Sequence, residues 1–131
     1  MHLDHVGIAL EDAKEGADLF RRLFGLPLAL ERTVPDQGVK VVKLSSGESY
    51  CEFLEPLSPD TPVGRFLAKR GGGLHHVCFA VPDIRAAIAD LVGKGAAMID
   101  REPRTGAAGL PIAFLQPSST AGILVELVER K

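Results

Sequence analysis

Short runs in which apolar and polar residues alternate predict strands, and longer runs with apolar residues every three to four positions predict helices. The first alternating run is Leu3–Leu10. A helix is predicted over residues 12–24, with Gly25 as its C-terminal cap and an apolar side made of Ala13, Ala17, Phe20 and Phe24. Three further strands are predicted at residues 26–34, 39–44 and 50–54. The first half of the chain is therefore predicted to be β-α-β-β-β.

The same order of elements returns in the second half. A connecting helix is predicted to begin near Pro62, capped by Asp60 or Thr61, and to end at three consecutive glycines, residues 71–73. Leu74–Val81 is then a predicted strand, and Asp83 is expected to cap a second long helix. The remaining predicted strands are residues 98–100, 111–115 and 123–128. The repeat indicates two modules of one kind.

A chain of 131 residues has the length of one compact domain. We expect a single domain over residues 1–131, with module one at about 1–57, a connector at about 58–72 and module two at about 73–131. Each module alone has about four strands with unpaired edges and a concave face, so each needs the other. The predicted fold is α+β, with two paired βαβββ modules that form a cup-shaped mixed sheet.

Two histidines and two glutamates occupy matching places in the two modules. His5 and His76 are each third in a short apolar run, and Glu52 and Glu126 follow them by 47 and 50 residues. The strand period of two puts small neighbours on the face of each histidine, which leaves space above it: Gly7 and Ala9, then Cys78 and Ala80.

A carboxylate buried among apolar residues needs a cation or several hydrogen-bond donors. Two imidazoles and two carboxylates suit one divalent ion such as Co²⁺, Mn²⁺, Ni²⁺, Fe²⁺ or Zn²⁺. An octahedral ion with these four ligands would keep two positions for a bidentate substrate. We therefore predict a metal site formed by His5, Glu52, His76 and Glu126.

A single histidine or glutamate on a strand usually has a structural role, and only the repetition in register favours a metal site. The strand period places His2 and His75 on the opposite face, so they are predicted to lie outside the site. Glu55 and Glu129 are out of phase with Glu52 and Glu126 and are interpreted as charges on the outer face.

Charge and composition narrow the range of expected partners and cellular locations. The net charge of −2 gives no general attraction to nucleic acid or to anionic lipid, and we expect neither as a partner. No apolar run approaches the roughly 20 residues that cross a bilayer, and no signal peptide is evident. Cys51 and Cys78 do not make a disulfide framework, so a reducing, cytoplasmic location is expected.

Several stretches resemble a known family. The paired modules and their ligands are similar to the vicinal oxygen chelate superfamily, which includes glyoxalases, bleomycin resistance proteins and dioxygenases. Within it, the resemblance is to the methylmalonyl-CoA epimerase family and extends along essentially the whole chain. The stretches that carry it are residues 3–9 (LDHVGIA), 35–39 (PDQGV), 73–77 (GLHHV), 106–117 (GAAGLPIAFLQP) and 122–127 (GILVEL).

The resemblance implies a glyoxalase-like fold and an isomerase that interconverts (2R)- and (2S)-methylmalonyl-CoA through an enolate stabilised by a divalent metal, with Co²⁺ favoured. It places the metal ligands on His5, Glu52, His76 and Glu126, and it implies an acyl-CoA substrate and a homodimer. One position departs from the pattern. Val41 stands where some relatives have a glutamate base, so a second base has to come from elsewhere in this chain.

The resemblance makes Glu126 the first candidate for the base, with Glu52 and Glu48 as further candidates. The loop from Arg104 to Pro111 is a candidate for backbone contacts to the substrate. Candidate partners for the CoA phosphates are Lys69, Arg70, Arg101 and Arg104. Two alternatives stay open: a glyoxalase I-type lactoylglutathione lyase with the same metal, and a metal-free small-molecule-binding protein of the same fold. A ring-cleaving dioxygenase fits less well, because it uses two histidines and one carboxylate.

Overall fold

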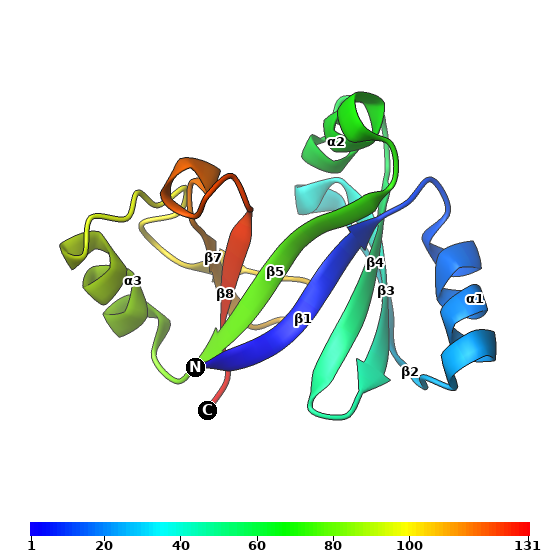
Figure 1. Cartoon of the computed structure of the whole chain (residues 1–131), viewed down its shortest axis with the longest axis horizontal. Coiled ribbons are helices and arrows are strands. Elements are labelled where there is room, and N and C mark those ends of the chain that lie inside the picture. Colours follow the sequence, from blue (N-terminus) through cyan, green and yellow to red (C-terminus); the bar gives the residue numbers. More distant parts are fainter. The chain divides into compact units, whose positions relative to one another are not determined.

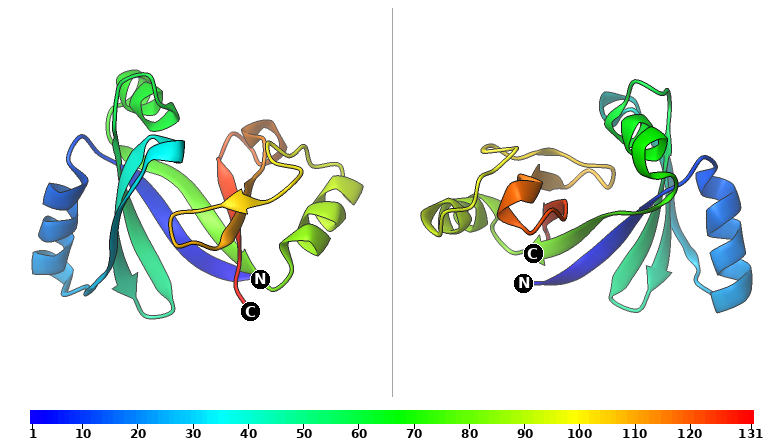
Figure 2. Two further views of the ribbon diagram at one scale, coloured as in Figure 1. Left: turned by 180° about the vertical axis from the view of Figure 1, so that it is seen from behind. Right: turned by 45° about the horizontal axis from the view of Figure 1, so that its top comes forward.

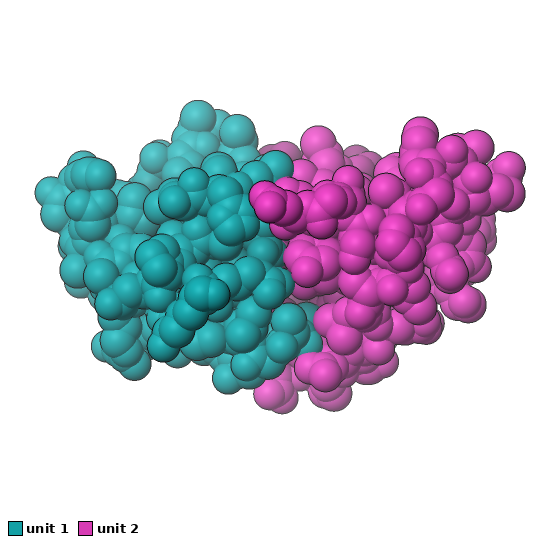
Figure 3. Space-filling view, turned by 90° about the horizontal axis from the view of Figure 1, so that it is seen from below, with its two compact units in different colours: residues 1–4, 76–131 teal, residues 5–75 magenta.

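The computed structural model describes all 131 residues, with eight strands and three α-helices in chain order (Figure 1). The chain divides into two compact units, coloured separately in Figure 3. Unit 2 comprises His5–His75, and unit 1 comprises Met1–Asp4 together with His76–Lys131. None of the helices combines the length and the apolar character that crossing a membrane requires.

Unit 2 contains four neighbouring strands in the order β2-β3-β4-β1. They are β2 (Leu28–Val34), β3 (Val39–Ser46), β4 (Ser49–Pro56) and β1 (His2–Ala9), of which β1 enters the unit at His5. β1 and β4 run parallel, whereas β3 is antiparallel to both β2 and β4. β3 and β4 form a hairpin, since Ser46 pairs with Ser49 and Gly47 between them has a φ of 63°.

Helix α1 (Ala13–Phe24) covers one face of these strands (Figures 1 and 2). Its N-terminus is capped by Asp12, whose carboxylate accepts the Glu15 N–H at 2.9 Å. Gly25 ends the helix in the left-handed conformation predicted for it. The buried residues between helix and strands are Ala13, Ala17, Val42, Leu44 and Phe53. The predicted apolar side of this helix is therefore confirmed at its alanines, whereas Phe20 is only partly buried and Phe24 is exposed.

Helix α2 (Pro62–Arg70) is the predicted connecting helix. Its cap is Thr61, whose hydroxyl accepts the Gly64 N–H at 3.0 Å, and Pro62 occupies the first turn. The backbone of Ser58 and Pro59 folds against Gly64: a Cβ at residue 64 would lie 2.4 Å from the Ser58 carbonyl oxygen. The start of α2 therefore requires a residue without a side chain.

Gly64→Ala is expected to destabilise the protein by about 1–3 kcal/mol, because the added methyl group overlaps backbone atoms that cannot rotate away. The matched control is Gly93→Ala at the end of helix α3 (Ile84–Gly93), where a Cβ meets nothing within 4 Å. That control is expected to be neutral or to stabilise by roughly 0.5 kcal/mol. Urea unfolding of both variants measures the difference; equal stabilities would contradict the packing described for Gly64.

Unit 1 repeats the arrangement with strands in the order β5-β8-β7-β6. They are β5 (Gly73–Val81), which enters the unit at His76, β8 (Val125–Glu129), β7 (Pro111–Phe114) and β6 (Arg104–Thr105). β5 and β8 run parallel, and the other pairs are antiparallel. Helix α3 begins after Asp83, whose carboxylate accepts the Ala86 N–H. Buried residues of α3 and the strands form one apolar core: Val81, Ile84, Ile88, Met98, Ala113, Leu115 and Leu127. Both predicted βαβββ modules are present.

The prediction of a strand at residues 98–100 was wrong. Only Met98 makes a β-bridge, an isolated one to Leu115, and the strand beside β7 is β6 at Arg104–Thr105. The Asp100 side chain accepts the backbone N–H of Phe114 at 2.9 Å. The Phe114 N–H therefore bonds to a side chain, where a neighbouring strand would offer it a backbone carbonyl. A regular ladder of backbone hydrogen bonds does not continue at residues 98–100.

Glu55 and Glu129 were predicted to be outer-face charges, and the structure gives both the same specific role. The Glu55 carboxylate accepts the N–H of Ala13, the first residue of α1, at 3.0 Å. The Glu129 carboxylate accepts the N–H of Ile84, the first residue of α3, also at 3.0 Å. In each module, the end of one strand therefore supplies a negative charge to the N-terminus of the helix that packs on it.

Glu129→Ala is expected to lower the free energy of unfolding by about 1 kcal/mol, because it removes a charged acceptor from a helix N-terminus. The control is Glu102→Ala, whose exposed ion pair with Arg85 is expected to contribute less than about 0.5 kcal/mol. Thermal or urea unfolding compares them. A Glu129 variant no less stable than the Glu102 variant would contradict this role.

Asp4 forms an ion pair within unit 1. It is 1% exposed, and its Oδ1 lies 2.5 Å from Nε of Arg130, the residue that follows β8. A carboxylate buried this deeply needs a partner. The pair links the first residues of the chain to the residue after its last strand, within unit 1.

Candidate metal centre

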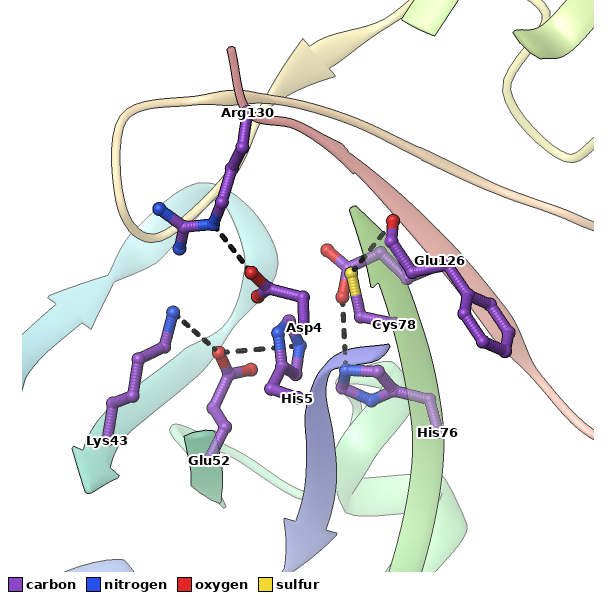
Figure 4. Close-up of polar contacts among 9 residues, drawn as sticks. Asp4, His5, Lys43, Glu52, His76, Cys78, Glu126 and Arg130 are labelled. Atoms are coloured by element: carbon purple, nitrogen blue, oxygen red, sulfur yellow. Dashed lines mark hydrogen bonds and ion pairs between the residues drawn. The ribbon is translucent and has the colours of Figure 1, made fainter. Parts of the chain in front are cut away.

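The first predicted ligand pair, His5 and Glu52, lies within unit 2. It is built by the parallel strands β1 and β4, whose register sets Gly7 opposite Glu52 and leaves room beside the carboxylate. His5 Nε2 lies 3.6 Å from Glu52 Oε2, and both side chains are buried (Figure 4). The small neighbours predicted for His5 thus accompany a real histidine–carboxylate contact.

The second predicted pair, His76 and Glu126, lies within unit 1 and repeats the first. Its strands β5 and β8 are again parallel neighbours, and His76 Nε2 lies 3.1 Å from Glu126 Oε1 (Figure 4). The edge of the His76 ring meets Phe114, with ring centroids 5.9 Å apart. The buried apolar residues of this region include Cys78 and Ala80, the small residues predicted to share the face of His76.

The spacing within each pair suits two ligands of one divalent ion. Donor atoms bound about 2.1 Å from an ion stand roughly 3.0 Å apart at a right angle and about 3.4 Å apart at a tetrahedral angle. The measured separations, 3.1 Å and 3.6 Å, are close to these values. In residue type, burial and spacing, each pair therefore fits half of the predicted N₂O₂ set.

Lys43 adds a charge that the sequence analysis did not predict. Its ammonium lies 3.5 Å from Glu52 Oε2, the same oxygen that faces His5 (Figure 4). It also lies 5.1 Å from the centre of the Tyr50 ring. Only 5% of Lys43 is exposed. A signal for it does exist in the sequence: Lys43 has the strand phase of Val39 and Val41, which are buried.

Val41 is one of the most deeply buried residues of unit 2, and its β4 partner is Leu54. It stands two residues before Lys43 on β3 and therefore faces the same side. Its side chain has no group that could accept a proton. The face that carries Glu52 is consequently apolar at this position.

The other histidines lie outside both pairs, as predicted. His2 is exposed. His75 packs against Phe66 of α2, with ring centroids 4.8 Å apart and the planes nearly perpendicular. Adjacent residues of β5 therefore have different surroundings: His75 contacts a helix, and His76 contacts a carboxylate.

The two cysteines are free and packed on strands. Cys78 is fully buried, and burial raises the pKa of the Cys51 thiol. A thiol with a raised pKa stays protonated at neutral pH and is a poor metal ligand. Cys51 is therefore not expected to act as a metal ligand.

The basic residues predicted to meet CoA phosphates are exposed, and some already have partners. Arg70 lies over the Phe66 ring. Arg104 lies over the Phe114 ring and is 3.3 Å from the Asp100 carboxylate. Lys69 and Arg101 are exposed as well. Their role in binding CoA stays a prediction.

Residues 4–114 match the family model described as the Glyoxalase/Bleomycin resistance protein/Dioxygenase superfamily. Curated relatives extend the similarity to nearly the whole chain. A Bacillus subtilis protein, uncharacterized protein YqjC, is 40% identical over 98% of this chain and 92% of its own. The mitochondrial methylmalonyl-CoA epimerase of Homo sapiens is 38% identical, over 95% of this chain and 72% of its own. The ethylmalonyl-CoA/methylmalonyl-CoA epimerase of Cereibacter sphaeroides is 39% identical over 95% of both chains.

Solved structures show the same fold. A hypothetical protein from Bacillus halodurans, BH1468, matches with a TM-score of 0.94 and 41% identity, over 98% of this chain and 94% of its own. A methylmalonyl-CoA epimerase in complex with methylmalonyl-CoA and NH4+ matches with a TM-score of 0.92 and 36% identity, over 98% of this chain and 93% of its own. The predicted α+β, glyoxalase-like fold class is confirmed.

Proposed function

We propose, because this chain belongs to the glyoxalase/bleomycin resistance protein/dioxygenase superfamily, that it interconverts (2R)- and (2S)-methylmalonyl-CoA with a bound divalent metal ion. Relatives that it matches over nearly its whole length are named methylmalonyl-CoA epimerase, and one solved relative holds methylmalonyl-CoA. The observation that carries the proposal is the repeated contact of a buried histidine with a buried carboxylate, His5 with Glu52 and His76 with Glu126.

The proposed ligands of one ion are His5, Glu52, His76 and Glu126. Support comes from the equivalent strand positions of the two pairs and from donor spacings that suit adjacent ligands. When bound, a divalent cation supplies positive charge that stabilises the negative charge developing on the substrate's thioester oxygen. Co²⁺ is favoured, and Mn²⁺, Ni²⁺, Zn²⁺ and Fe²⁺ are the alternatives that accept the same nitrogen and oxygen donors.

The proposed role of the protein is to move a proton at C2, between the thioester and the carboxylate. Epimerisation removes a proton from one face of that carbon and returns one to the other face. Glu126 is the proposed first base, a buried carboxylate on β8 that contacts His76. Glu52 is the second candidate, although its Oε2 faces both His5 and Lys43. Val41 supplies only apolar surface, which helps to exclude water from the same face.

The direct test incubates (2R)-methylmalonyl-CoA with the protein in D₂O and follows both deuterium incorporation at C2 and the appearance of the 2S epimer. We expect both in the Co²⁺-loaded protein, loss of both after dialysis against a chelator, and recovery when Co²⁺ is returned. Exchange that survives complete removal of the metal would contradict the proposed role of the ion.

The same preparations separate the alternative functions. A glyoxalase I-type enzyme would convert methylglyoxal and glutathione while leaving C2 of methylmalonyl-CoA unexchanged. A metal-free binding protein would retain no stoichiometric metal after dialysis against metal-free buffer. Either result would replace the epimerase proposal. A homodimer, a cytoplasmic location and CoA contacts by the basic residues stay predictions from the sequence.

A further inference from the structure

Lys43 is unusual among the lysines of this chain because its side chain is almost fully buried. Lysine is seldom buried unless its charge is paired. The partner here is Glu52, 3.5 Å from the ammonium, and the face of the Tyr50 ring forms a further contact. A buried cation therefore lies directly beside a proposed metal ligand.

The strands dictate this placement. Lys43 on β3 pairs directly with Glu52 on β4 in the antiparallel register, so the two side chains stand side by side on one face. Tyr50 precedes Glu52 by two residues on β4 and therefore shares that face. The ammonium is held between a carboxylate and an aromatic ring that are both fixed to one strand.

The charges at the proposed metal centre define how Lys43 affects the binding of metal and substrate. Glu52 and Glu126 together carry two negative charges, which a divalent cation neutralises. An anionic substrate such as a malonyl thioester adds negative charge to that neutral centre. The ammonium of Lys43 supplies one positive charge beside the oxygen of Glu52 that also faces His5. The same charge repels any cation that this oxygen binds.

We propose that Lys43 competes with the bound ion for the Glu52 carboxylate and sets the net charge of the metal centre. This inference rests on the proposed function. Lys43 thereby favours binding of an anionic substrate and weakens binding of the metal. The two effects have opposite signs, which separates this role from simple packing.

Calorimetric titration of the metal-free protein with Co²⁺ tests the charge role without any activity measurement. Four proteins form a cycle: wild type, Lys43→Met, Glu52→Gln and the double variant. The charged side chains at the proposed centre, Lys43, Glu52 and Glu126, sum to −1 in the wild type and in the double variant. It becomes −2 in Lys43→Met and zero in Glu52→Gln.

We expect Lys43→Met to bind Co²⁺ about tenfold more tightly than the wild type, and Glu52→Gln to bind it at least about tenfold more weakly. The double variant is expected to return to within about threefold of the wild type. Lys43→Arg keeps the charge and is the control, with wild-type affinity. If Lys43 only fills space, Lys43→Met binds Co²⁺ as the wild type does or more weakly, and the double variant shows no recovery.

A second readout uses the KM for methylmalonyl-CoA at saturating Co²⁺. Lys43→Met is expected to raise the KM about tenfold. The double variant is expected to have a KM close to that of the wild type. A change in kcat with an unchanged KM would overturn the substrate part of the proposal. If the wild type binds Co²⁺ but Lys43→Met does not bind it more tightly than the wild type does, the role of Lys43 is overturned and the proposed function is not affected. Absence of Co²⁺ binding in all four proteins would contradict this role and the proposed function together.

Discussion

His76→Ala is expected to abolish measurable C2 exchange, with kcat/KM lower by at least about 10³-fold. The substitution removes one of two nitrogen donors and leaves the buried Glu126 carboxylate without the imidazole that lies 3.1 Å away. Two consequences follow, since the ion loses a ligand and the proposed base loses its neighbour. Co²⁺ affinity is expected to fall more than about hundredfold. Exchange kinetics and metal titration measure the two effects separately.

The preceding residue offers a matched control. His75 sits on the same strand but packs against Phe66 of α2, 4.8 Å between ring centroids, outside both histidine–carboxylate pairs. His75→Ala is therefore expected to lose only about 1 kcal/mol of stability and to keep its Co²⁺ affinity and exchange rate. If the two alanine variants lost activity equally, with folded circular dichroism spectra, the face assignment within β5 would be wrong.

Glu126→Gln is expected to have the next largest effect. An amide oxygen can still occupy the ligand position, but it cannot accept the C2 proton. We expect kcat to fall by about 10²–10⁴-fold, the usual contribution of a general base. The loss in Co²⁺ affinity is expected to be smaller than in His76→Ala, because an oxygen donor remains. Single-turnover exchange at saturating metal separates these contributions.

The comparison for Glu126 is Glu129→Gln on the same strand. Glu129 accepts the N–H of Ile84 at the start of α3, so its substitution is expected to affect stability and leave exchange unchanged. Retention of most of the exchange rate by Glu126→Gln would remove Glu126 as the base and favour Glu52. Equal loss in both glutamine variants would indicate general damage to β8.

The sequence predicted the elements best where the local signals were strong. Asp83 caps α3 and Gly25 ends α1, as predicted, because these requirements depend on residues within one turn. Strand phase also separated His76 from His75 correctly, since a period of two leaves no other choice within a straight strand.

Contacts between distant segments account for the errors. β6 has only two residues, and the Asp100 side chain accepts the Phe114 N–H where a strand was expected. Glu55 and Glu129 reach helix N-termini 42 and 45 residues away, which no local pattern indicates. Lys43 was missed for a different reason: a lysine on a strand is usually exposed, and its strand phase with Val39 and Val41 does not by itself reveal the pairing with Glu52.

The proposed function requires that one divalent ion binds to both histidine–carboxylate pairs. A crystal structure of the Co²⁺-loaded protein, with diffraction recorded at the cobalt absorption edge, tests it most directly. We expect one anomalous peak per chain, with donor atoms of His5, Glu52, His76 and Glu126 each about 2.0–2.3 Å away. A peak bound by only one of the pairs, or by other residues, would contradict it.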